Sequence, residues 1–325
     1  MSHEFQADAS GKVPFAFVGE QTWHGLGQKL QPGAPIPVWI EEAGFNYNIE
    51  AGVVECQAGD SKVIMPNKRL LYRNDTKAPL AVVGDKYKIV QPPDVLKFYE
   101  DLVASGGFHL ETAGVLFGGS RYFALAKVAE HQQVVDGDAI GGYLLLATAC
   151  DGSLATTAQF TSVRVVCNNT LQMALRDTSG KELKRIKVPH SREFDHVAVK
   201  EQLGLSQSSF QLFMQDMRVL AKRPLMNNEA ANFLIGLVGD PTQSLQDQEP
   251  GPANLMKSIW HLYSGAAKGA SMAGKTAYGM LNAVTEYADH HTGHKTADAR
   301  LDAAWFGKTA EMKAKAYEQL MFMTA

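Results

Sequence analysis

The sequence predicts an α+β fold in which an antiparallel β-meander with packed helices is followed by an α-helical C-terminal part. Between residues 108 and 167, apolar segments of strand length come in two pairs, and each pair is joined by a short turn that contains glycine. Beyond residue 193 the apolar residues recur instead at the spacing of helix faces. Strands followed by helices, rather than alternating with them, are typical of the α+β class.

The chain has 325 residues, of which 45% are hydrophobic and 20% charged. This length exceeds that of a usual single domain, and the composition allows an ordinary core. We therefore predict a β-rich α+β domain with an N-terminal arm at residues 1–180, a basic linker at 181–192 and a helical region at 193–325.

The first hundred residues predict an arm, strands and one helix. Residues 1–40 are rich in Gly and Pro and indicate an extended arm with few regular elements. Residues 62–84 predict strands around an Asn-Asp-Thr turn. A helix should begin at Pro93 or Asp94 and end at Gly106-Gly107. Its core-facing residues would be Val95, Phe98, Tyr99, Leu102 and Val103.

Two hairpins form the meander. The first joins residues 108–117 to 121–128 through Gly118-Gly119, and the second joins 141–150 to 154–167 through Asp151-Gly152-Ser153. After them, Asn168, Asn169 or Thr170 can cap a helix at residues 171–177. We expect a helix to lie across one face of this sheet.

Helices fill the C-terminal region. Phe210, Phe213, Met214, Met217 and Leu220 keep helical spacing, and Pro224 ends that run. Asn227 or Asn228 can cap a helix that ends at Gly239, and Pro252 suits the first turn of the next helix. Residues 275–291 and 298–322 complete the helical part.

Composition narrows the possible functions. The formal net charge is −3, so the chain has no dominating basic surface for duplex DNA. Its three cysteines form no CxxC pair and no disulfide framework, which fits a reducing compartment. The start has no apolar signal segment, and the longest apolar stretch, residues 143–150, is far shorter than the roughly 20 residues that span a bilayer. These features predict a cytoplasmic protein with no membrane partner.

Residues 269–276, GASMAGKT, match the phosphate-loop pattern, with Gly269, Gly274, Lys275 and Thr276 at its defining positions. In that motif backbone N–H groups and the lysine hold phosphates, and a buried strand must precede it. The residues before it, NLMKSIWHLY, are at least as typical of a helix. The alternative is a linker of small residues that enters the following helix.

The helix after that linker carries polar residues on one side. Asn282, Glu286, Asp289 and His290 lie at helical spacing opposite an apolar stripe. Glu286, His290 and His294 can supply metal ligands, and Glu286 and His290 can share a proton. The alternative is a structural or interface polar network, since histidines are also favoured in a last helical turn.

Cationic side chains are the candidates for nucleic-acid contact. Arg121, Arg164 and Arg176 lie on or beside the meander, where an internal salt bridge is the alternative to a phosphate contact. The predicted linker adds a local excess of positive charge, although such a run is usually a solvated loop. Its cations are Lys181, Lys184, Arg185, Lys187 and Arg192. Trp23 can offer an aromatic platform or pin the arm to the core. No catalytic motif is present, and no cofactor is expected.

Several segments together resemble a family of phage- and plasmid-encoded proteins known only as a domain of unknown function. They are TWHGLG, GDKYKIVQP, the GGSRYF hairpin, DGSLATTAQFTSVRVVCNNTLQMAL and TAYGMLNAVTEYADH. The resemblance implies a mobile-element origin and no particular activity. The order of helix, meander and helix is also similar to the core of phage single-strand annealing recombinases, which form rings and hold DNA in a basic groove.

The leading hypothesis is therefore a homo-oligomeric protein that binds or anneals single-stranded DNA in the recombination or replication of a mobile element. A protein that binds a host or phage protein, for host takeover or as a decoy, is the first alternative. An enzyme that depends on a nucleotide or a metal, using Lys275 or the Glu286/His290 pair, is the second.

Overall fold

The computed structural model describes residues 11–19, 27–104, 108–164, 170–172, 175–176, 182–183, 185–203, 207–293 and 297–324. Contacts divide the chain into two units that alternate along it. Unit 1 comprises residues 1–129, 143–160 and 175–206, and unit 2 comprises residues 130–142, 161–174 and 207–325. The predicted domain bounds are consecutive instead, and they stay a prediction.

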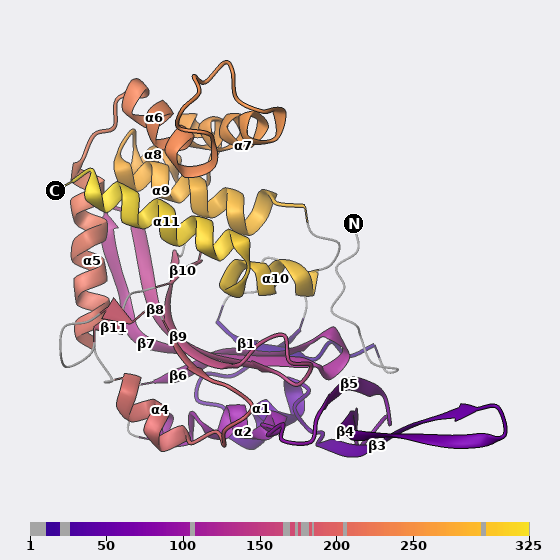
Figure 1. Cartoon of the computed structure of the whole chain (residues 1–325). Coiled ribbons are helices and arrows are strands. Elements are labelled where there is room, and N and C mark those ends of the chain that lie inside the picture. Colours follow the sequence, from indigo (N-terminus) through magenta and orange to yellow (C-terminus); the bar gives the residue numbers. More distant parts are fainter. Residues whose placement is uncertain are drawn as a thin grey trace. The chain divides into compact units, whose positions relative to one another are not determined.

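An antiparallel sheet holds the predicted meander, with strand order β10-β9-β8-β7-β6-β1-β2, and β13 pairs with β9 (Figure 1). Its strands are β1 (Phe15–Val18), β2 (Gln28–Leu30), β6 (His109–Leu116), β7 (Arg121–Val135), β8 (Asp138–Ala149), β9 (Thr156–Arg164), β10 (Thr170–Gln172) and β13 (Ile186–Val188). Only the β1–β2 pair is parallel among the registers of the described strands. The α+β class and the meander are confirmed.

The turns of the meander form as their residues predict. Between β6 and β7, Gly118 and Gly119 have φ of 66° and 113°, values that glycine adopts without a Cβ penalty. Between β8 and β9, Gly152 has φ of 79° and the Ser153 N–H donates to the Asp151 carboxylate at 2.9 Å. The turn between β7 and β8 is Asp136-Gly137. This turn was not predicted, because β7 continues beyond residue 128 and β8 begins before residue 141.

Unit 1 contains a second sheet and short helices. Its remaining elements are α1 (Ile36–Glu42), β3 (Ile49–Ala58), β4 (Ser61–Arg73), β5 (Pro79–Gly84), α2 (Pro92–Lys97), α3 (Glu100–Ala104), the 3₁₀ turn η1 (Phe117–Gly119), β11 (Leu175–Arg176), β12 (Glu182–Leu183) and α4 (His196–Leu203). Strands β3, β4 and β5 form an antiparallel sheet in that order. The helix predicted from residue 93 is α2 and α3, broken at Phe98-Tyr99. The Tyr99 hydroxyl anchors this break to the main sheet through the carbonyl oxygens of Ala124 (2.9 Å) and Leu144 (3.1 Å).

Unit 2 is built mainly of helices. They are α5 (Gln207–Lys222), α6 (Asn227–Val238), α7 (Pro250–His261), the π-helical turn η2 (Leu262–Ala266), α8 (Ala270–Ala273), α9 (Ala277–Glu286), the π-helical turn η3 (Tyr287–His291), α10 (Ala297–Phe306) and α11 (Lys308–Phe322). The apolar stripe of α5 is buried as its spacing predicts. Phe210 lies so close to Gly142 of β8 that an added Cβ would stand 2.7 Å from its ring. A helix thus packs on the sheet, as expected.

The structure adds to or differs from the local predictions in four places. The N-terminal arm contains β1, whose Phe15, Ala16 and Phe17 are buried by pairing with β6. Within the segment predicted as a helix, residues 171–172 belong to β10 and residues 175–176 to β11, because pairing with β9 satisfies the backbone groups of β10. The basic linker contributes β13, whose Ile186 is buried. Gly307 divides the helix predicted at 298–322 in two.

The cap of α6 also differs from the prediction. Met226 occupies the N-cap position, and its N–H donates to the Glu229 carboxylate at 2.8 Å. Asn228 accepts from the Glu229 N–H at 2.9 Å, one residue inside the helix.

Trp23 and Cys167 lie outside the described residues.

Candidate nucleic-acid interface

Two segments of unit 1 that are distant in sequence meet at a cationic hollow. The Lys88 N–H donates to the His190 carbonyl at 2.6 Å, which joins the segment after β5 to the segment after β13. The hollow has a volume of about 560 Å³. Its lining, here named the Lys88 hollow, consists of Arg69, Asp85, Lys86, Tyr87, Lys88, Ile89, Ser191 and Glu193.

A stacked aromatic pair holds the two segments together. The rings of Tyr87 and His190 lie 4.5 Å apart at 16°. The Tyr87 hydroxyl donates to the Ala149 carbonyl at 2.8 Å, and burial raises the pKa of this phenol, so the hydroxyl stays a neutral donor. His190 Nδ1 lies 3.0 Å from the Lys88 carbonyl, which requires a proton on that nitrogen. Both rings are half-buried, so the stack is fixed yet reachable.

Cationic residues stand on either side of Tyr87 in the chain. Lys86 and Lys88 are exposed, and Arg69 donates to the Tyr87 carbonyl at 2.7 Å. Opposing charge comes from Asp85 and from Glu193, whose carboxylate lies 2.7 Å from the Lys88 ammonium. Both side chains of that ion pair are largely exposed, so it contributes at most about 1 kcal/mol and can exchange for a phosphate contact.

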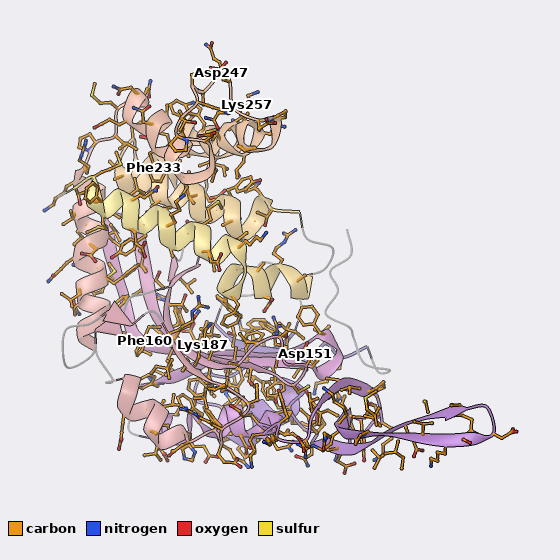
Figure 2. All side chains as sticks on the ribbon, in the orientation of Figure 1. Asp151, Phe160, Lys187, Phe233, Asp247 and Lys257 are labelled. Carbon is orange, nitrogen blue, oxygen red and sulfur yellow. The ribbon has the colours of Figure 1, made fainter. Side chains whose placement is uncertain are left out.

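Three of the predicted cations belong to the segment that reaches the Lys88 hollow. Arg185 is half-buried, whereas Lys187, on β13 (Figure 2), and Arg192 are exposed. In the chain, Arg192 stands between Ser191 and Glu193, which both line the hollow. Lys86 and Lys88 were not among the predicted cations, although the segment Lys-Tyr-Lys places two cations beside an aromatic residue in the chain.

Arg121 is poorly placed for phosphate. Only 8% of this residue is exposed, and its guanidinium donates to the Ser153 hydroxyl at 2.5 Å and lies 5.4 Å from the Phe117 ring centre. Burial lowers its pKa, and the charge of Asp151 opposes that effect. The side chains of Arg164, Arg176, Lys181 and Lys184 lie outside the described part of the chain.

The phosphate-loop match has a different geometry from the motif. Helix α7 and η2 precede it where a buried strand is required. Its backbone N–H groups donate to nearby carbonyl oxygens, as from Gly274 to Ala270 (2.9 Å) and from Met272 to Gly269 (3.1 Å). These donors are therefore not directed at a ligand.

The remaining residues of the match have structural contacts in unit 2. The Lys275 ammonium lies 4.8 Å from the Tyr263 ring centre, a cation–π distance. Thr276 caps α9 by accepting from the Gly279 N–H at 3.0 Å. The segment contains α8 and leads into α9, so its contacts agree better with the alternative of a small-residue segment than with a phosphate loop.

A π-helical turn changes the register of the predicted metal site. The turn η3 follows Glu286 directly, and a π-helix brings residues five apart together. His291 consequently lies beside the Glu286 carboxylate (3.6 Å), in the place that an α-helix would give His290. The other Glu286 oxygen accepts from the Lys268 N–H at 2.8 Å. His294 lies outside the described residues, and within the described ranges no three His, Cys, Asp or Glu side chains form a metal-binding group.

The polar residues of this region are buried in unit 2. Asn282, Thr285, Glu286 and Asp289 are each less than a tenth exposed, and Lys313 of α11 reaches Asp289 at 2.5 Å with 2% exposure. Hydrogen bonds join Thr285, Glu286 and Asp289 to other residues of unit 2, as the alternative of a structural polar role expects. Across the described helices, none is long and apolar enough to cross a membrane.

The fold and the hollow together define an α+β protein with an antiparallel sheet, a helical second unit and an exposed cationic hollow. The chain belongs to the family described as Domain of unknown function (DUF932), which matches residues 79–305. This range includes residues 85–89, Ser191 and Glu193 of the Lys88 hollow and the buried polar residues from 282 to 289, whereas Arg69 and Lys313 lie outside it. Comparison with curated proteins and with solved structures gives no match.

Proposed function

We propose that this protein binds single-stranded DNA, as an annealing-like, homo-oligomeric protein of a phage or plasmid in the bacterial cytosol. The observation that carries the proposal is the Lys88 hollow, which exposed Lys86 and Lys88 line together with Tyr87, whose ring stacks on His190. Cations that follow a backbone beside aromatic rings that can stack on bases are the combination used for single strands without sequence preference. The antiparallel meander with a packed helix supports it by analogy alone.

A local cationic hollow is compatible with DNA binding by a protein whose net charge is close to zero. A few cations gathered at one place attract a phosphate backbone even when the net charge is slightly negative. Binding of this kind is electrostatic, so affinity should fall linearly with the logarithm of salt concentration. The acidic Glu193 beside Lys88 should keep the affinity modest.

Fluorescence anisotropy with a labelled oligonucleotide of about 30 nucleotides tests the proposal at low and moderate salt. The double variant Lys86→Ala/Lys88→Ala should reduce the salt slope by roughly 1.4, since each single-strand phosphate contact contributes about 0.7. Lys257→Ala, which removes an exposed lysine of unit 2 (Figure 2), is the matched control and should behave as the parent. No binding at low salt, or no salt slope, would reject DNA binding. A double variant with the parent's slope would reject this location.

A protein-binding role is the second candidate, and one observation favours it. An open groove of about 520 Å³ in unit 2 runs between α6 and α11, where its lining includes Phe233 and Phe322 (Figure 2 labels Phe233). Phe322 is 85% exposed, which is unusual for so large an apolar side chain. This role predicts no salt-dependent binding of an oligonucleotide, so the same titration separates it from the first.

A further inference from the structure

The turn between β6 and β7 holds Phe117 in an unfavourable backbone conformation. Its φ is 52°, in the left-handed region that Gly, Asn and Asp adopt readily and that is an outlier for a bulky residue. Conformations of this kind persist only where the surrounding structure enforces them, and they cluster at functional sites. Because 40% of Phe117 is exposed, full burial in the core does not explain the large ring either. The ring is therefore a candidate for a ligand contact.

Hydrogen bonds fix the backbone that carries this ring. The carbonyl groups of the three residues after Phe117 each accept one, in chain order from the Arg73 guanidinium (3.3 Å), the Tyr47 hydroxyl (2.9 Å) and the Cys150 N–H (2.8 Å). These donors come from β4, from the segment before β3 and from the end of β8. The support of the ring is thus in place before any ligand arrives, which lowers the entropy cost of binding.

The charges close to the ring are balanced. The Arg121 guanidinium lies 5.4 Å from the ring centre, and the charge of Asp151 acts on this cation. Arg73 donates two hydrogen bonds to the Asp75 carboxylate, at 3.0 and 2.7 Å. The turn therefore offers an accessible aromatic ring without an excess of positive charge. Such a ring suits a flat, uncharged group such as a nucleobase rather than a phosphate.

One peptide group connects this turn to the Lys88 hollow. The carbonyl of Ala149 and the N–H of Cys150 belong to the same planar unit and point in opposite directions. The carbonyl accepts from the Tyr87 hydroxyl, and the N–H donates to the carbonyl of Ser120, each at 2.8 Å. With standard bond lengths, the Tyr87 hydroxyl and the Ser120 carbonyl oxygen are at most about 8 Å apart.

The turn between β8 and β9 gives a second link. Arg121, beside the ring, donates to the Ser153 hydroxyl at 2.5 Å, and His190 Nε2 lies 3.2 Å from the carbonyl oxygen of Leu154. Ser153 and Leu154 are adjacent in the chain, so the ring and the Tyr87–His190 stack have neighbours in the same short turn. Both are within reach of one strand, because single-strand sites cover about 4–16 nucleotides per small binding fold.

We infer that Phe117 stacks on a nucleobase of the single strand whose phosphates the Lys88 hollow holds. The inference rests on the proposed function and adds to it a base contact outside the hollow. One stacked base contributes roughly 5- to 150-fold in affinity and is insensitive to base identity, since every base has a π-face. The contact should depend little on salt, because it neutralises no phosphate.

Phe117→Asn removes the ring and leaves a residue that tolerates the left-handed conformation. In anisotropy with the same labelled oligonucleotide, it should raise the dissociation constant at least about fivefold at every salt concentration and leave the salt slope unchanged. Phe117→Tyr keeps an aromatic ring and should bind as the parent does. Phe322→Asn removes a ring of unit 2 that is 85% exposed, and this matched control should also bind as the parent does.

A second measurement uses the parent itself and so does not depend on the folding of a variant. An oligonucleotide that contains 5-iodouracil photo-crosslinks to an aromatic ring stacked on that base, and mass spectrometry should locate the crosslink at Phe117. Crosslinks confined to other residues, or an equal loss of affinity in Phe322→Asn, would overturn the inference. A parent that binds no oligonucleotide at low salt removes the proposed function and the inference together. A parent that binds as tightly as Phe117→Asn removes the inference alone.

Discussion

The buried ion pair between Lys313 and Asp289 allows a quantitative test of the packing of unit 2. The ammonium and the carboxylate are 2.5 Å apart, and the two side chains are only 2% and 5% exposed. Lys313→Met keeps most of the side-chain volume and removes the charge. Asp289 is then left buried beside an apolar side chain.

The expected cost follows from desolvation. Breaking a buried pair on one side costs about 3–5 kcal/mol, because the remaining charge has lost its partner without regaining water. Replacing both members by apolar residues is often neutral or stabilising. Lys313→Met should therefore lower the free energy of unfolding by about 3–5 kcal/mol, and Lys313→Met/Asp289→Leu should recover most of that loss.

Urea unfolding followed by circular dichroism at 222 nm measures these differences in one double-mutant cycle. Asp289→Asn adds a pH test, because burial lowers the pKa of Lys313 while Asp289 opposes that effect. A lysine whose folded pKa is depressed binds fewer protons folded than unfolded, so stability rises with pH. The deficit of Asp289→Asn should shrink as pH rises toward the ordinary lysine pKa of about 10.4, as neutral lysine becomes available. A loss below about 1 kcal/mol for Lys313→Met, or a double variant no better than it, would refute the reasoning.

Three further perturbations have definite outcomes. Two hydrogen bonds from Arg73 lower the pKa of Asp75 from 3.8 to about 2. The stability that the ionised Asp75 adds to the folded state is therefore present above pH 3.8 and is lost as pH falls toward 2. The difference in urea midpoint between the parent and Asp75→Asn should accordingly shrink over that interval, and a constant difference would contradict it. Gly142→Ala places a methyl group 2.7 Å from the buried Phe210 ring and should cost about 1–3 kcal/mol in urea unfolding, whereas an unchanged midpoint would mean that the ring moves freely. Glu193→Gln removes the carboxylate beside Lys88 and should tighten oligonucleotide binding in anisotropy, while weaker binding would place the DNA elsewhere.

Local periodicity was sufficient for much of the fold. The apolar segments on either side of Gly118-Gly119 and Asp151-Gly152-Ser153 form paired strands, and the stripe from Phe210 to Leu220 forms the buried side of α5. Strand alternation, helix spacing and glycine turns depend on residues close in sequence, so they can be recognised there. The turn at Asp136-Gly137 could not be recognised in this way, because the polar residues before it have low β-propensity and nevertheless belong to β7.

The candidate site depended on contacts between distant residues. Lys88 and His190 are 102 positions apart, and their backbone hydrogen bond and the Tyr87–His190 stack bring Ser191 and Glu193 to the hollow that Lys86 and Lys88 also line. Likewise β13 becomes a strand because β9 offers it an open edge, and η3 brings His291 to Glu286 by one additional residue in a helical turn. The sequence by itself determined the strands of the two predicted hairpins and the strongly periodic helices such as α5, since those preferences are local. Only the tertiary structure decided which of the charged side chains meet, because edge pairing and helix register are settled by packing and hydrogen bonding between segments far apart in the chain.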